Sequence, residues 1–145
     1  IMLGCRAPPL AAVIIEPRVM ASALVALESV VRHTPKATCI VWFVSTDNMP
    51  WVREQQIVHQ LARQGRIELR QVPQYAISRP SVVNAPSMLT HHSFWRSLPS
   101  ELVLTFQSDS LMCSTLDLSR FGRYAQVGAP WRSNFRRCIH SQRSF

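Results

Sequence analysis

The sequence contains very little glycine, and this scarcity excludes several common nucleotide-binding motifs. Only four of the 145 residues are glycine: Gly4, Gly65, Gly122 and Gly128. Neither a GxGxxG dinucleotide-binding turn nor a GxxxxGK[ST] phosphate loop can be built from them. A GxSxG nucleophile elbow is absent as well, which disfavours an α/β-hydrolase. A nicotinamide-dependent dehydrogenase and a P-loop ATPase are therefore not expected.

Long apolar runs and paired cysteines are also missing. No stretch approaches the roughly 18 apolar residues of a membrane-spanning helix, so no transmembrane segment is expected. The four cysteines form no CxxC pair, which argues against a zinc site. Cys39 and Cys113 lie in or beside apolar segments and are expected to be small buried residues. The compartment, Golgi and secretory or cytoplasmic, stays open.

Lysine is almost absent, yet the chain is basic. Sixteen basic residues, of which only Lys36 is lysine, face eight acidic ones and give a net charge of +8. A basic balance suits anionic partners such as phosphates or nucleic acids. Because no long basic run forms a patch, we expect no specific nucleic-acid partner. A nucleic-acid-binding module that uses the arginines of residues 132–145 is the weaker alternative.

The hydrophobic pattern alternates between strands and helices. Four segments have the composition of strands: residues 10–15, 39–44 and 102–106 are predominantly apolar runs expected to be buried on both faces, and residues 66–72 alternate like a half-buried strand. Three have the spacing of amphipathic helices: residues 18–33, 51–64 and 87–97. Gly65 is a plausible helix C-cap. Trp42, Phe94 and Trp95 are expected in the core. Residues 73–86 look irregular, and residues 124–129 suggest a further short strand.

This alternation predicts an α/β fold, a Rossmann-like sandwich with a mainly parallel central sheet flanked by helices. We expect residues 1–9 to be a disordered leader, residues 10–131 to form the domain, and residues 132–145 to be a basic tail. The chain begins at Ile1 rather than methionine, and we interpret it as a fragment or a processed product.

Ligands of parallel sheets bind beyond the carboxyl ends of the strands. Asp109 follows the predicted strand 102–106 and stands between Ser108 and Ser110. A carboxylate there suits a hard divalent cation, Mg²⁺ or Mn²⁺, which would act as a Lewis acid on a departing diphosphate. The plainer interpretation is an aspartate that caps the next turn, and composition alone favours it.

Two more polar pairs follow predicted strands. Glu16 and Arg18 flank a proline, where Arg18 would hold a phosphate and Glu16 a ribose or a base edge. A surface ion pair explains them equally well. Asp47 and Asn48 follow the second strand, and an ordinary turn is the favoured interpretation of this pair.

Four short motifs occur in order along the chain. They are residues 12–18 (AVIIEPR), 94–99 (FWRSLP), 106–110 (FQSDS) and 127–131 (VGAPW). Together they resemble a family of glycosyltransferase-like domains catalogued as domain of unknown function 5672. The resemblance covers about residues 11–131.

That family resembles nucleotide-sugar transferases of the GT-A type. The resemblance implies a GT-A-like fold in which an acidic strand-end motif, usually D-x-D, holds a divalent metal and the diphosphate of a nucleotide-sugar donor. It makes Asp109 and Ser110 the candidate metal ligands. The candidate nucleotide contacts are Glu16, Arg18, Asp47, Asn48 and Ser108. The implied activity is sugar transfer to the hydroxyl of an unidentified acceptor.

The sequence departs from this pattern in two places. Ser-Asp-Ser supplies one carboxylate where two are usual, although Mg²⁺ keeps several waters and one carboxylate plus diphosphate can hold it. The resemblance stops after Trp131, so we expect the domain to be truncated before its acceptor side and its catalytic base. A catalytically inactive fragment or pseudoenzyme of the same fold is the alternative.

Overall fold

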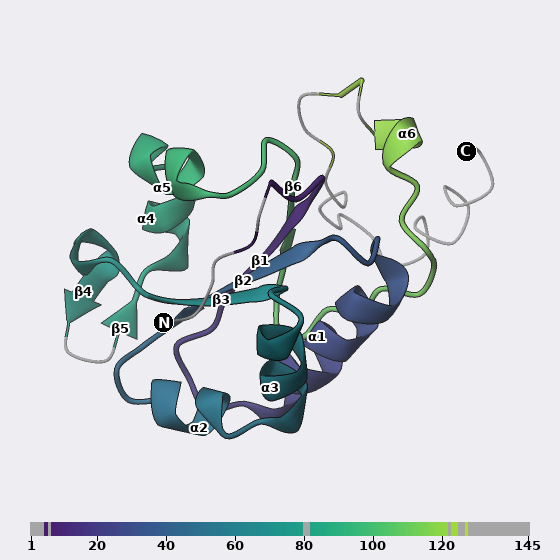
Figure 1. Ribbon diagram of the computed structural model, residues 1–145. Coiled ribbons are helices and arrows are strands. Elements are labelled where there is room, and N and C mark those ends of the chain that lie inside the picture. The colour runs from purple at the N-terminus through teal and green to yellow at the C-terminus, as the bar shows by residue number, and fades with distance from the viewer. Residues whose placement is uncertain (1–4, 6, 80–81, 122, 125–126, 128–145) are drawn as a thin grey trace, which may run out of the picture.

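The centre of the domain is a four-stranded sheet (Figure 1). The computed structural model describes residues 5, 7–79, 82–121, 123, 124 and 127. The strands of the sheet are β1 (Ala11–Ile15), β2 (Cys39–Val44), β3 (Ile67–Gln71) and β6 (Val103–Phe106). Their order is β3-β2-β1-β6, and every pair is parallel. The predicted α/β fold with a parallel central sheet is confirmed.

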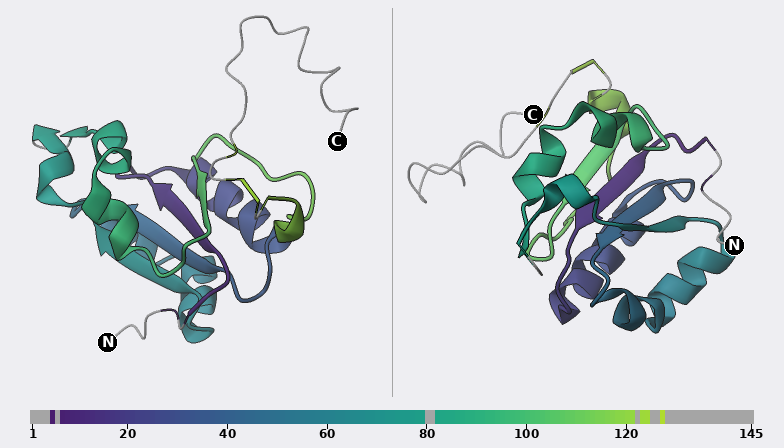
Figure 2. Two further views of the ribbon diagram at one scale, coloured as in Figure 1. Left: turned by 90° about the horizontal axis from the view of Figure 1, so that it is seen from above. Right: turned by 90° about the vertical axis from the view of Figure 1, so that its left-hand side faces the viewer.

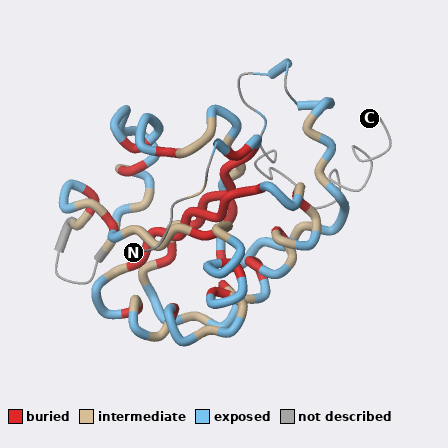
Figure 3. Tube along the Cα trace, in the orientation of Figure 1, coloured by how far each residue is buried: buried red, intermediate tan, exposed pale blue. Residues whose placement is uncertain are grey.

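The two middle strands form the most deeply buried part of the chain (Figure 3). Val13 of β1 is aligned with Val41 of β2 on one side and with Thr105 of β6 on the other. Every residue of β2 is buried, as its continuous apolar run predicted. Strands that are apolar on both faces require a covering layer on each side of the sheet.

Helices supply both layers (Figures 1 and 2). One face is covered by α1 (Ala21–His33), α2 (Met49–Arg53) and α3 (Gln56–Arg63), whose buried residues pack with Ile14 and Trp42. The other face is covered by η1 (Gln74–Ala76), α4 (Ala85–Leu89) and α5 (His92–Ser97), which pack with Val13 and Phe43. The chain therefore changes face between β3 and β6.

Two of the predicted helices are interrupted. The segment 51–64 divides because Gln55 adopts an extended backbone with ψ 131°, and the segment 87–97 divides because His91 does so with ψ 121°. Gly65 follows the C-cap residue Gln64, has a positive φ of 64° and donates its N–H to the carbonyl of Ala62, so the prediction that this glycine ends the helix is confirmed.

Three expectations about the second half of the chain are corrected. Residues 73–86 are not irregular throughout, since they include η1 and a short antiparallel hairpin of β4 (Ile77–Arg79) and β5 (Val82–Val83). Strand β6 is only partly buried, because within the described part of the chain it pairs with β1 alone. Trp95, expected in the core, is 40% exposed, while its neighbour Phe94 is buried.

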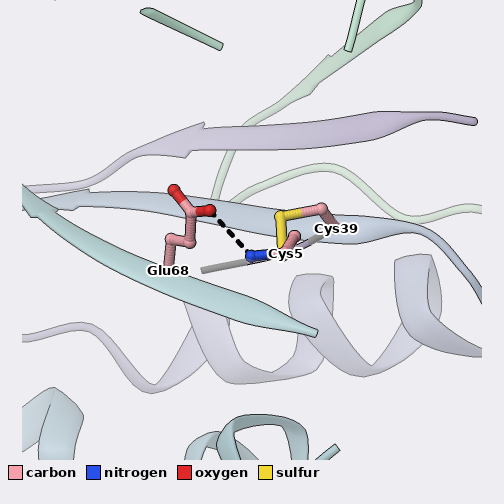
Figure 4. Close-up of side chains that lie close together, drawn as sticks. All are labelled: Cys5, Cys39 and Glu68. Carbon is pink, nitrogen blue, oxygen red and sulfur yellow. Dashed lines mark hydrogen bonds between the residues drawn. A yellow bond between two sulfur atoms is a disulfide. The ribbon is translucent and has the colours of Figure 1, made fainter. Parts of the chain in front are cut away.

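Of the two cysteines expected to be buried, Cys39 is buried and Cys113 is not. Cys39 forms a disulfide with Cys5 (Figure 4). Cys113 is an exposed free thiol. Glu68 of β3 accepts a 2.9 Å hydrogen bond from the Cys5 N–H beside the disulfide. The segment before β1 is therefore tied to the sheet at Cys5.

The last helix of the described residues is α6 (Leu118–Phe121). Within the described ranges no helix is long and apolar enough to cross a membrane. The tail 132–145 and most of the predicted strand 124–129 lie outside the described residues, and so does most of the leader 1–9.

Candidate functional site

Strand order locates the candidate site between β1 and β6. From β1 the chain adds β2 and β3 on one side, and then returns to place β6 on the opposite side of β1. In open α/β sheets a crevice forms outside the carboxyl ends of the strands where the winding direction reverses, and ligands bind there. Glu16 directly follows β1, and Ser108 follows β6 by two residues. Both lie at this switch point.

A buried carboxylate joins the two strand ends. Glu16 is 3% exposed, and its Oε2 accepts a 2.7 Å hydrogen bond from Ser108 Oγ. The same carboxylate accepts the Arg18 Nε–H at 2.8 Å and an Nη2–H at 2.9 Å, as well as the backbone N–H of Arg18 at 3.1 Å. Sequence reasoning left open whether Glu16 and Arg18 are a surface ion pair. Glu16 is instead buried, and only Arg18 reaches solvent, with a side chain that is 69% exposed.

These contacts control ionisation at the switch point. Burial alone raises the pKa of Glu16, but the hydrogen bonds from Arg18 and Ser108, together with the Arg18 charge, outweigh burial and hold the pKa below its usual value. The pKa of Arg18 is raised, first by the hydrogen bonds and charge of Glu16 and then, more weakly, by the charge of Asp109. Glu16 and Arg18 therefore form a fixed ion pair with Asp109 nearby.

Asp109 is exposed on the turn that follows β6. Within the described ranges its carboxylate accepts no hydrogen bond, so the turn-cap interpretation does not describe it. Ser110 performs that role instead: its Oγ accepts the Gln107 N–H at 2.8 Å and donates to the Gln107 carbonyl at 2.7 Å. The hydrogen bonds of Ser110 thus stabilise the turn, and the Asp109 carboxylate is not engaged by the described residues and is available to a ligand.

The turn after β2 reaches across to the turn after β1. Asn48 is buried, and its Nδ2 donates to the carbonyl oxygens of Glu16 at 2.8 Å and Arg18 at 3.0 Å. Its neighbour Asp47 is exposed and makes no hydrogen bond to these groups in the described part of the chain. Asn48 therefore belongs to the assembled site as a support, whereas Asp47 only shares the same edge of the sheet.

Sequence reasoning missed two members of this arrangement. Ser45 Oγ donates a 2.7 Å hydrogen bond to the carbonyl of Pro17, and the Trp42 indole N–H donates a 3.4 Å hydrogen bond to the carbonyl of Glu16. A serine directly after a buried strand was the available signal for Ser45. Nothing in the sequence separates Trp42 from an ordinary core tryptophan.

Two other features do not add to the site. A groove of about 470 Å³ lies between α1 and α3, and none of the predicted site residues lines it. Cys5, Cys39 and Glu68 lie within metal-binding distance of one another, but the two sulfurs are joined in the disulfide and are not available as thiolate ligands. The strand ends of β1 and β6 thus remain the candidate site.

Of the comparisons with known proteins, the one with protein families found a match. No curated protein and no solved structure gives a significant match to the chain. A family model described as "Protein of unknown function (DUF5672)" matches residues 66–144, from just before β3 to beyond the described residues. The match includes Ser108, Asp109 and Ser110, whereas Glu16, Arg18 and Asn48 lie before it. Since the match covers more than half of the sequence, the chain belongs to the DUF5672 family of proteins of unknown function.

Proposed function

We propose that this chain is a glycosyltransferase-like domain that binds a nucleotide-sugar donor at the β1/β6 switch point and transfers the sugar to an acceptor hydroxyl. One observation carries the proposal. Glu16 and Arg18 are paired after β1, where an open parallel sheet offers its ligand crevice, and the exposed Asp109 follows β6 close enough for its charge to act on the exposed Arg18 side chain.

The charges at this point suit a divalent cation that is bound together with an anion. Glu16 and Asp109 are negative and Arg18 is positive, so the three formal charges sum to −1. One Mn²⁺ or Mg²⁺ would change the sum to +1 and would make the position attractive to a diphosphate. Asp109 fits as a metal ligand because its carboxylate is exposed and is not engaged by the described residues. Ser110 fits less well, since its hydroxyl oxygen already accepts the Gln107 N–H within the turn.

Arg18, Glu16 and Ser108 would have different roles in binding the diphosphate. Arg18 spends two of its five guanidinium N–H groups on Glu16, which leaves three without a partner among the described residues, and those three would donate to phosphate oxygens. Glu16 fixes the guanidinium plane, and Ser108 holds Glu16. A bound metal would supply Lewis-acid stabilisation of the departing diphosphate.

The test is calorimetry of the purified chain with UDP, GDP and ADP in the presence of Mn²⁺. Wild type is expected to bind at least one of these nucleotides, and Asp109→Ala is expected to weaken binding at least tenfold, because the metal loses its protein carboxylate. Asp109→Ala should fold normally, since exposed substitutions away from special features usually change stability by less than about 0.5 kcal/mol.

The matched control is Glu101→Ala, which removes an exposed acid beside the opposite end of β6. It changes the net charge equally but lies far along the strand from the crevice, so binding should be unchanged. Equal nucleotide affinity in wild type and Asp109→Ala would refute the metal role of Asp109. An equal loss of affinity in Asp109→Ala and Glu101→Ala would refute it as well.

A second candidate is a domain of the same fold that binds the donor without transferring its sugar. The observation that favours it is the state of Glu16, the other acid at the switch point. Its carboxylate is ion-paired with Arg18, accepts the Ser108 hydroxyl and has a lowered pKa, so it is poorly suited to act as a base. Release of nucleoside diphosphate from a nucleotide sugar, followed over time with simple acceptors, separates the two. Binding without release supports the second candidate.

A further inference from the structure

Three consecutive carbonyl groups of the turn after β1 are held by side chains of the turn after β2. Asn48 Nδ2 donates to the oxygens of Glu16 and Arg18, at 2.8 and 3.0 Å, and Ser45 Oγ donates to the oxygen of Pro17 at 2.7 Å. Asn and Ser at a strand end normally bond within their own turn. Here the contacts cross to a segment about 30 residues away in the chain.

Ser45 and Asn48 also form hydrogen bonds with each other. Asn48 Oδ1 accepts the Ser45 N–H at 2.9 Å, and the Asn48 N–H donates to Ser45 Oγ at 3.1 Å. Both amide hydrogens of Asn48 are used, and the residue is only 1% exposed. Asn48, which the sequence suggested as a nucleotide contact, therefore has no polar hydrogen left for a ligand.

The 16–18 turn carries two of the three charged groups of the candidate site, Glu16 and Arg18. Arg18 has a long side chain, and ordering such a side chain costs up to about 2 kcal/mol of conformational entropy. Its backbone is fixed at both ends of the turn, by the Asn48 contact at its own carbonyl and by the Asn48 and Trp42 contacts at Glu16. Fixing a binding group before the ligand arrives lowers the cost of binding.

We propose that Ser45 and Asn48 are positioning residues, which hold the 16–18 turn so that Glu16 and Arg18 keep one fixed geometry beside Asp109. The consequence for ligand binding rests on the proposed function, because the ligand expected there is the diphosphate of a nucleotide. The positioning itself is a property of the free protein and is measurable without a ligand.

The experiment compares Ser45→Ala with Ser45→Thr. Alanine removes the hydroxyl that holds Pro17, whereas threonine keeps it. Thr46→Ala is the control, because Thr46 is exposed in the same turn and makes no side-chain hydrogen bond to the described residues. A second disruptive variant, Asn48→Asp, keeps the acceptor for the Ser45 N–H and removes the amide donors; if it does not fold, the Ser45 series still decides.

Two readouts are taken on each variant. NMR titration of the Glu16 carboxyl reports whether Arg18 still holds it, and calorimetry reports affinity for Mn²⁺ with UDP, GDP or ADP. In Ser45→Ala the Glu16 titration should move to higher pH and nucleotide affinity should fall about five- to tenfold, the usual effect of losing one hydrogen bond. Ser45→Thr and Thr46→Ala should each keep the Glu16 titration and the nucleotide affinity of the wild type.

The outcomes separate this inference from the proposed function. A lower melting temperature in Ser45→Ala with an unchanged Glu16 titration would show that Ser45 only stabilises the fold, and would overturn the positioning role. A shifted titration in a protein whose wild type binds no nucleotide would support positioning and refute the proposed function. Nucleotide binding that is equal in wild type and Ser45→Ala would remove the link between the two.

Discussion

Ser108 and Glu16 lie 92 residues apart in the chain and are joined by a 2.7 Å hydrogen bond from Ser108 Oγ to Glu16 Oε2. Both residues are buried, at 9% and 3% exposure. This hydrogen bond connects the ends of β1 and β6 at the position where the winding of the sheet reverses. Asp109, the next residue after Ser108, is near enough to Arg18 for its charge to contribute to the raised pKa of Arg18.

Replacing Ser108 by alanine should destabilise the domain measurably. The variant leaves one lone pair of a buried carboxylate unsatisfied, and hydrogen bonds to charged groups contribute about 1.5–3 kcal/mol. Urea unfolding monitored by tryptophan fluorescence would show the loss. Ser110→Ala is the comparison, because its hydroxyl bonds within an exposed turn, and it should cost less. Equal losses would contradict the special place of Ser108.

Stability should depend on pH through Glu16. Because its pKa in the folded protein is lowered, the ionised group stabilises the fold above the ordinary glutamate pKa of about 4.3, and this contribution is lost as the pH falls through the lower folded value. The free energy of unfolding of wild type should therefore fall more steeply than that of Glu16→Gln below about pH 4.3. Denaturant titrations between neutral and acidic pH measure the difference.

Glu101→Gln serves as the control for that series, since it changes an exposed acid beside the other end of β6. It should follow the wild-type curve. If Glu16→Gln followed it as well, the ion pair with Arg18 would not be the source of the acid sensitivity.

Reduction of the Cys5–Cys39 disulfide should lower stability substantially. The two cysteines are separated by 34 residues, and closing a loop of that size stabilises a fold by about 4 kcal/mol in the chain-entropy model. Thermal unfolding with and without dithiothreitol tests this directly. Thiol titration of the denatured protein should find two fewer reactive thiols before reduction than after it. Cys113→Ser, which changes an exposed free thiol, should leave the melting temperature unchanged.

The neighbours Phe94 and Trp95 should respond very differently to truncation. Phe94 is 2% exposed and packs 5.3 Å from the ring of Phe43, so Phe94→Ala should cost about 3–5 kcal/mol. Trp95 is 40% exposed and contributes an indole hydrogen bond to the Leu89 carbonyl, so Trp95→Ala should cost about 1 kcal/mol. Guanidinium unfolding of the pair provides the measurement, and the reverse order would be inconsistent with this packing.

The sequence predicted the strands well because their apolar runs record burial on both faces. Residues 39–44 were expected as a buried strand, and β2 has those bounds and is buried throughout. Helix continuity was harder to predict, because the break at Gln55 depends on backbone geometry that hydrophobic spacing does not encode. Trp95 was wrongly expected in the core for a related reason. It lies in α5, a short helix whose orientation depends on contacts with distant residues.

The candidate site was predictable in position but not in detail. Strand-end polarity identified Glu16, Arg18 and Asp109, since parallel strands deliver their carboxyl ends to one edge of the sheet. The hydrogen bond from Ser108 to Glu16 and the contacts of Asn48 could not be predicted, because they depend on the strand order, which places β6 on one side of β1 and β2 on the other. The disulfide of Cys5 was not predictable either, because spacing along the chain says nothing about which cysteine lies opposite another.

The way the site is connected also suggests an order of assembly. The grip of Ser45 and Asn48 on the 16–18 turn involves only the first 48 residues, whereas Ser108 comes much later in the chain. Nearby segments pair sooner than distant ones, and a nascent chain emerges from its N-terminus. We therefore expect the Arg18 turn to be shaped before β6 arrives, so that docking of β6 completes the site. Residue-resolved hydrogen exchange should then show β6 opening more readily than β1 and β2.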